Sequence, residues 1–262
     1  MTILDTIIEV KHQEVAQGKK KFPPGYWQDQ PFYTRQCISL VQRLREPSAS
    51  GIIAEFKRKS PSKGFIHEHA DVVNVTNAYT SNGASGLSIL TDEQFFGGST
   101  ADLTAARNLD IPILRKDFII DTYQVDEAKA IGADLILLIA ACLQKYQVEE
   151  LAAYAHTLGL EVLLELHDES ELDHVCSTVD LVGINNRNLK DFTVDIDRSL
   201  RMAKVLGHDR PLIAESGIDD PSQVRLFREA GFEGFLIGEQ FMKSPDPGKA
   251  LHTFVANLNF PV

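Results

Sequence analysis

Cysteine is scarce in this sequence of 262 residues. Only Cys37, Cys142 and Cys176 occur, far apart and without a CxxC pair. This spacing excludes a zinc ribbon and a framework of paired disulfides, because both need several cysteines at short or regular intervals. We therefore expect buried thiols in a reducing compartment, the cytoplasm.

Long apolar runs and an excess of positive charge are also missing. No stretch approaches the roughly 20 apolar residues that span a membrane. Asp5 and Glu9 interrupt the apolar pattern of the N-terminus, which argues against a signal peptide. The formal net charge is -11, from 26 Lys and Arg against 37 Asp and Glu. Because nucleic-acid backbones bind Lys and Arg, we expect neither a nucleic-acid nor a membrane partner.

What the sequence does contain is a repeated alternation of apolar runs and helical patterns. The runs recur every roughly 20–30 residues, and their continuous apolarity indicates strands buried on both faces, as in parallel sheets. Eight such repeats predict an α/β fold, a (β/α)8 TIM barrel with an N-terminal helical extension, as a single domain over residues 1–262. The runs are GIIAEF, ASGLSIL, IPILRK, ADLILLIA, LEVLLEL, DLVGINN, PLIAES and GFLIG.

An open doubly wound sheet is the alternative fold. It normally has a glycine-rich GxGxxG turn after its first strand, whereas here the first strand leads into KRKSPSKG, so the barrel is favoured. Residues 1–50 precede the first strand and predict two helices, at roughly 3–18 and 33–45. Either these helices plug the closed end of the barrel or they cover its open end as a lid.

Polar side chains stand at the ends of five of these strands. Alternate side chains of a barrel strand face the axis, and barrels carry their chemistry at the carboxyl ends of the strands. One such charge is usually a solvated rim residue, but five strands that end in this way predict a converging active site. The side chains are Glu55, Lys57, Lys116, Glu165, Asn185, Arg187 and Glu215.

A second group of residues predicts a phosphate site. Barrels often bind phosphate through backbone amides that follow strands seven and eight. Gly217 follows the seventh strand and Gly238 the eighth, and Ser60 in the loop SPSKG adds a hydroxyl. A glycine after a strand is more often only a turn, but the combination favours a phosphate. His67 and His69 do not share a helical face, so we expect no metal site.

Taken together, these stretches resemble the indole-3-glycerol-phosphate synthase family of tryptophan biosynthesis. The motifs occur in the family's order and cover residues 52–243, and ILDTIIEVKHQEV resembles the family's opening helix. One departure is Lys59, where the family usually has a small residue, and it leaves the detail of that loop open. The motifs are IIAEFKRKSPSKG, LSILTDEQFFGGS, PILRKDFI, LLELHDESEL, VGINNRNLKDF, LIAESGI and GFLIGEQFM.

The resemblance implies a carboxy-lyase that needs no cofactor. Its substrate, 1-(2-carboxyphenylamino)-1-deoxyribulose 5-phosphate, closes a ring and loses carbon dioxide and water to give indole-3-glycerol phosphate. The resemblance also favours the lid for residues 1–50. We expect this small phosphorylated molecule as the partner, and a monomer or weak homo-oligomer in the cytoplasm, and whether another enzyme of tryptophan biosynthesis binds the chain stays open.

Site residues are carried over from the resemblance position by position. Lys116 matches the general acid, and Glu165 matches the acid–base carboxylate. Lys57 matches the contact to the substrate carboxylate. The division of catalytic roles between the two lysines is left open. Glu55, Asn185 and Glu215 match residues that orient the reacting centre. The substrate-binding positions are Arg187 at the mouth, then Ser60, Ser216, Gly217, Gly238 and Glu239 at the phosphate, and Phe96, Phe118, Leu137, Ile139 and Leu189 around the aromatic ring. For these last five, plain packing is the alternative.

Two other functions stay open. Another phosphate-binding barrel enzyme, an isomerase or a Schiff-base aldolase, would use the same phosphate site and a mouth lysine. A catalytically silent sensor of a phosphorylated ligand would need the phosphate site alone. The presence of both Lys116 and Glu165 disfavours the sensor, because binding alone needs no acid–base pair.

Overall fold

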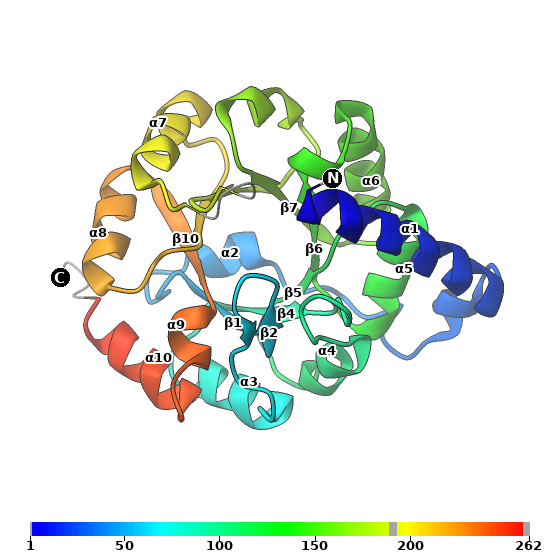
Figure 1. The fold of residues 1–262 in the computed structure, drawn as a ribbon, viewed down its shortest axis with the longest axis horizontal. Coiled ribbons are helices and arrows are strands. Elements are labelled where there is room, and N and C mark those ends of the chain that lie inside the picture. The colour runs from blue at the N-terminus through cyan, green and yellow to red at the C-terminus, as the bar shows by residue number, and fades with distance from the viewer. Residues whose placement is uncertain (1, 189–192, 259–262) are drawn as a thin grey trace.

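A computed structural model of the chain describes residues 2–188 and 193–258. Within these residues, eight parallel strands close into a barrel in the order β1-β10-β9-β8-β7-β6-β5-β4, which confirms the predicted fold (Figure 1). A short hairpin of β2 (Lys59–Ser60) and β3 (Gly64–Phe65) follows β1. The barrel strands are β1 (Ile52–Phe56), β4 (Gly86–Leu90), β5 (Ile113–Lys116), β6 (Leu135–Ile139), β7 (Glu161–Leu166), β8 (Leu181–Asn185), β9 (Leu212–Glu215) and β10 (Phe232–Ile237).

Helices surround the strands. Many of them begin after an Asp or Ser whose side chain accepts a hydrogen bond from a backbone N–H of the first turn, as Asp71, Ser99 and Asp220 do. The connection after β7 is the 3-10 helix η3 (Glu169–His174). The others are α3 (Val72–Ser81), α4 (Thr100–Ala106), α5 (Thr122–Ile131), η2 (Ala140–Cys142), α6 (Lys145–Thr157), α7 (Ile196–Leu206), α8 (Pro221–Glu229), α9 (Glu239–Met242) and α10 (Pro247–Ala256).

Alternate residues of each strand fall into two apolar clusters. Ile53, Leu163 and Ile213 belong to the cluster inside the barrel. Their neighbours Ile52 and Val162 belong to the larger cluster between strands and helices. The continuous apolar runs are thus explained by burial on both faces, as the sequence indicated. The same alternation decides which polar residues at the strand ends face the barrel axis.

The N-terminal segment differs from its prediction. Helix α1 (Ile3–Lys21) is present and η1 (Tyr26–Asp29) follows it, but the helix expected over 33–45 is wrong: α2 covers only Leu40–Leu44. The backbone before it makes contacts with the barrel instead, because the Ile38 amide donates to Asp134 at 2.7 Å. The α2 residues Leu40 and Leu44 join the interior cluster at the amino ends of the strands.

The two N-terminal helices therefore lie at opposite ends of the barrel. Ile3, Leu4 and Ile7 of α1 line the cavity at the mouth. In Figure 1, α1 (dark blue) lies beside α5, and α2 is seen within the ring of helices. A lid role thus stays a prediction for α1 alone, and a single domain over residues 1–262 stays a prediction as well. None of the described helices is both long and apolar enough to cross a membrane.

Candidate active site

The polar strand ends meet at one end of the barrel. Their side chains face the axis, because the residues two positions earlier, among them Leu114, Leu163 and Ile213, belong to the interior cluster. The strand register places them near the carboxyl ends of the strands, each within two residues of the next around the barrel. Glu55 pairs with Ser88, Leu90 with Lys116, Ile139 with Glu165, and Asn185 with Glu215.

A cavity of about 340 Å³ opens at this end of the barrel. It brings together every predicted site residue that the structure describes, whereas Leu189 lies outside the described residues. The residues that line the cavity are Glu55, Lys57, Ser60, Phe96, Lys116, Phe118, Leu137, Ile139, Glu165, Asn185, Arg187, Glu215, Ser216, Gly217, Gly238 and Glu239.

Lys116 at the end of β5 has two carboxylate partners. Its Nζ lies 2.6 Å from Glu165 Oε2 and 2.8 Å from Glu215 Oε2. Burial disfavours the ammonium, but the attraction of Glu165, Glu215 and Glu55 outweighs burial and raises the pKa of Lys116. Lys116 therefore stays protonated at neutral pH and has a proton to donate.

The two carboxylates beside Lys116 titrate differently. Burial raises the pKa of Glu215 to about 8, against the attraction of Lys116 and with support from the negative Glu165. Burial acts on Glu165 as well, but Lys116 and then His167 outweigh it and hold the pKa of Glu165 well below its usual range. Near neutral pH the three groups thus comprise one ammonium, one carboxylate and one carboxylic acid, with no net charge.

Further polar contacts extend this cluster on both sides. Asn185 Nδ2 donates to Glu165 Oε1 at 3.0 Å, and the Arg187 amide donates to Asn185 Oδ1 at 3.0 Å. On the opposite side, Lys57 Nζ lies 2.7 Å from Glu55 Oε1. The Lys57 side chain is 17% exposed, so it presents a second cation to the cavity.

Backbone lines the cavity beside β9 and β10. Ser216 and Gly217 adopt φ angles of 66° and 69°, which turn the chain sharply after β9. A Cβ on Gly217 would lie 2.6 Å from a Val194 methyl, so glycine is required there. Gly238 immediately precedes α9, and the first amides of a helix have no partner within it. Backbone N–H groups of this kind suit an anion.

Side chains of both signs surround the same end. Lys63 pairs with Glu239, and Arg187 Nη2 lies 3.9 Å from Glu239 Oε2. Ser60 is buried, with its Oγ 3.5 Å from Ser62 Oγ. The loop after β1 and the start of α9 therefore close around one side of the cavity. Lys63 also lies in the loop SPSKG, which belongs to the phosphate site predicted from the sequence.

The other side of the cavity is apolar. The rings of Phe96 and Phe118 lie 6.2 Å apart, between centroids, and Leu137 and Ile139 rise from the interior cluster. The sequence prediction omitted Ile3, Leu4 and Ile7 of α1, which also line the cavity. The apolar stripe on the N-terminal helix was their signal, but it could not tell which end of the barrel the helix covers.

Sequence reasoning also missed two residues close to the charged cluster. His167 Nε2 lies 2.9 Å from Glu165 Oε1, a close contact without hydrogen-bond geometry. It lies two residues after Glu165, just beyond the end of β7, and this spacing was the available signal. Gly183 lies between Glu165 and Ile213 in the sheet, and a Cβ there would lie 2.2 Å from Glu215 Oε1.

This arrangement suits acid–base chemistry on an anionic molecule with an apolar part. A protonated lysine, a buried carboxylate and a buried carboxylic acid face a cavity with apolar side chains on one side and backbone amides on another. Among the described residues, no three or more His, Cys, Asp or Glu side chains form a group that could hold a metal ion.

Comparisons with known proteins identify relatives over most of the chain. The profile of the family described as indole-3-glycerol phosphate synthase matches residues 4–254. The indole-3-glycerol phosphate synthase of Bacteroides thetaiotaomicron is 55% identical over 216 residues, covering 82% of this chain and 83% of that protein. The enzyme of the same name from Burkholderia vietnamiensis is 45% identical over 254 residues, covering 95% of this chain and 97% of that protein.

Solved structures share the fold at low identity. 3-Hexulose-6-phosphate synthase aligns with a TM-score of 0.63 and 14% identity, covering 79% of this chain and 98% of that one. A chain of the tryptophan synthase complex from Pyrococcus furiosus aligns with a TM-score of 0.60 and 16% identity, covering 80% and 98%. At such identities the likeness concerns the barrel fold alone.

Proposed function

The chain belongs to the indole-3-glycerol phosphate synthase family, and we propose how its residues divide the work of that carboxy-lyase reaction. Its activity is the synthesis of indole-3-glycerol phosphate, a step of tryptophan biosynthesis, from a phosphorylated substrate. The proposed substrate is 1-(2-carboxyphenylamino)-1-deoxyribulose 5-phosphate. The observation that carries the proposal is the protonated Lys116 between Glu165 and Glu215, opposite an apolar wall.

The two ends of the cavity give the substrate one orientation. Its phosphate binds the backbone around Ser216, Gly217 and Gly238, with Ser60 and Arg187 nearby. Its aromatic ring lies against Phe96, Phe118, Leu137 and Ile139, where apolar area is removed from water. This orientation brings the ketone of the sugar chain to the charged cluster between the two ends.

Ring closure requires a proton donor at the ketone oxygen. As the ring carbon attacks the ketone carbon, negative charge develops on that oxygen, and Lys116 donates a proton to it. The carboxylates around Lys116 keep it protonated before the step, because they raise its pKa. Glu165 is ionised at this stage, so it can return a proton to Lys116 only after it has removed one from the substrate in the later dehydration.

Decarboxylation and dehydration follow ring closure, and they use Lys57 and Glu165. Lys57, held by Glu55, binds the substrate carboxylate until the carbon–carbon bond breaks and carbon dioxide departs, which restores the aromatic ring. Glu165 then removes the proton on the carbon beside the ring nitrogen, while Lys57 or Lys116 protonates the departing hydroxyl, so that water leaves. Asn185 holds Glu165 in place through its 3.0 Å hydrogen bond.

The alternative of a Schiff-base aldolase has less support. A Schiff-base lysine must lose its proton in order to attack a carbonyl, and desolvated lysines with lowered pKa values serve that role. Lys116 has a raised pKa, because Glu165 above all, with Glu215 and Glu55, accompanies it into the buried site. General-acid chemistry fits this environment better than nucleophilic attack.

Indole formation tests the proposal. Purified protein mixed with the substrate, without added metal or cofactor, should give indole absorbance and fluorescence. Lys116→Ala should lower kcat at least about 10²-fold, the low end for loss of a general acid. Near-normal turnover of that variant would remove Lys116 from its role. Borohydride trapping of the substrate on Lys116 would favour the aldolase instead.

The proposal includes α1 as a cover of the mouth, because its apolar residues line the cavity. It also includes a cytoplasmic location, which agrees with the free thiols of Cys37, Cys142 and Cys176. We further propose a monomer or weak homo-oligomer, which light scattering across a concentration series tests.

A further inference from the structure

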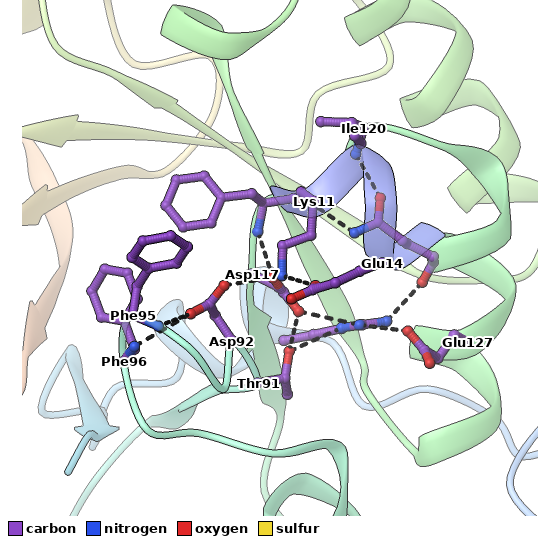
Figure 2. Close-up of polar contacts among 12 residues, drawn as sticks. Lys11, Glu14, Thr91, Asp92, Phe95, Phe96, Asp117, Ile120 and Glu127 are labelled. Carbon is purple, nitrogen blue, oxygen red and sulfur yellow. Dashed lines mark hydrogen bonds and ion pairs between the residues drawn. The ribbon is translucent and has the colours of Figure 1, made fainter. Parts of the chain in front are cut away.

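One buried lysine outside the catalytic cluster links α1 to the mouth. Lys11 lies one helical turn after Ile7, and its side chain is only 3% exposed. Its Nζ lies 2.9 Å from Asp117, 3.0 Å from Asp92 and 2.7 Å from Glu14. Figure 2 shows Lys11 pointing from α1 toward Asp92 and Asp117.

Asp92 organises the loop that carries one aromatic wall of the cavity. While its Oδ2 contacts Lys11, its Oδ1 accepts hydrogen bonds from the Phe95 amide at 2.8 Å and the Phe96 amide at 3.3 Å (Figure 2). The Asp92 side chain is fully buried. A change at this carboxylate therefore reaches the backbone of Phe96 directly.

Asp117 binds the backbone of the second aromatic residue, Phe118. Its Oδ1 accepts from the Phe118 amide at 2.8 Å and contacts Lys11, while its Oδ2 accepts from Thr91 at 2.6 Å. Burial would raise the pKa of Asp117, but Lys11 and Arg115 outweigh it and lower that pKa to about 2. Asp117 is thus ionised and paired at neutral pH.

From this geometry we propose that Lys11 is a positioning residue for the aromatic part of the substrate. It joins α1, which contributes Ile3, Leu4 and Ile7 to the cavity, to the two carboxylates that fix Phe96 and Phe118. Without its ammonium, Asp92 loses its ion pair with Lys11, and Asp117 keeps its ion pair with Arg115. Two buried like charges then share too little positive charge, and their loops must separate or take up water. The apolar pocket then widens, while the phosphate end beside β9 and β10 keeps its contacts.

The chain offers a matched control on the same helix. Lys19 also ties α1 to the barrel, with its Nζ 2.7 Å from Asp121 at the start of α5, but its side chain is 50% exposed. Neither lysine lines the cavity, but Lys11 contacts the carboxylates that bind the Phe96 and Phe118 amides, whereas Lys19 contacts Asp121. Lys11→Met and Lys19→Met therefore make the same chemical change to one helix, and only the first reaches the aromatic walls.

The experiment measures kcat and KM for indole formation, and inhibition by two fragments, 2-aminobenzoate and inorganic phosphate. Lys11→Met should raise KM and the inhibition constant of 2-aminobenzoate about tenfold, equal to about 1.4 kcal/mol of binding. The inhibition constant of phosphate and kcat should stay within about threefold of the wild-type values, because the lost interaction stabilises the bound substrate and the transition state equally. Lys11→Arg should restore most of the affinity, and Lys19→Met should behave like the wild type.

Two outcomes would overturn the proposal: equal effects of Lys11→Met and Lys19→Met, or equal weakening of both fragments. Should Lys11→Met fail to fold, Asp92→Asn provides the second variant. This variant keeps the Oδ1 acceptor for the two amides but weakens the contact to Lys11. The inhibition constant of 2-aminobenzoate should therefore again rise more than that of phosphate. The inference rests on the proposed function, and the wild-type assay separates the two: absence of indole refutes the function, whereas normal wild-type activity with unaltered variants refutes only the role of Lys11.

Discussion

A single methyl group at Gly183 should disable the charged cluster while leaving the barrel folded. Gly183 lies in β8, and a Cβ there would lie 2.2 Å from Glu215 Oε1 and 3.4 Å from Leu163 Cδ1. Its φ is not among the positive values, so the backbone accepts alanine without strain. The obstacle is the carboxylate alone, which Lys116 holds from its other oxygen at 2.8 Å.

The size of the effect follows from the overlap. Non-bonded carbon and oxygen approach to roughly 3.3 Å, so Glu215 Oε1 must move by about 1 Å. A displacement of that size in a catalytic cluster lowers the rate by about 10²-fold. Alanine is favoured over glycine in a strand by about 0.5–1 kcal/mol, which offsets part of the clash, so stability should change less than activity.

The assay compares kcat/KM for indole formation with the urea midpoint of unfolding. Gly234→Ala is the matched control, because its Cβ would lie 2.4 Å from Ile213 Cδ1 and 3.4 Å from Leu44 Cδ1, at the closed end of the barrel. Both variants press a methyl group into the barrel interior, but only Gly183→Ala displaces a member of the Lys116, Glu165 and Glu215 cluster. Activity of Gly183→Ala equal to that of Gly234→Ala would refute the reasoning.

Two further predictions concern Glu215 and α1. The pKa of Glu215 is about 8 in the folded chain against an ordinary 4.5, so folding binds a proton between these values. The stability that this proton contributes is therefore full below pH 4.5 and is lost as pH rises through about 8. The free energy of unfolding of the wild type should thus fall more than that of Glu215→Gln between about pH 6 and pH 9. Equal falls in the two proteins would contradict the raised pKa. Removal of residues 1–21 takes α1 away and exposes Asp92 and Asp117 to water, which relieves their desolvation, so KM should rise at least about tenfold while the melting temperature falls by only a few degrees. An unchanged KM would argue against α1 as a cover of the mouth.

The sequence by itself determined the barrel and the convergence of its charges. Continuous apolar runs separated by helical patterns leave few arrangements other than a parallel barrel. Once the barrel is given, the two-residue period of a strand decides that Lys116, Glu165 and Glu215 face the axis together with Leu114, Leu163 and Ile213. The order of apolar and polar residues within each strand was therefore sufficient to predict both the barrel and the convergence of the charged side chains.

Only the tertiary structure decided how the N-terminal segment divides between the two ends of the barrel. Both helices have an apolar stripe, and a stripe does not reveal which surface it covers. Leu40 and Leu44 close the bottom because Gly86 and Gly234 leave room for them there, and α1 reaches the mouth because Lys11 meets carboxylates 81 and 106 positions away in the chain. Contacts between residues so distant in sequence leave no local pattern, since each partner alone resembles an ordinary surface charge.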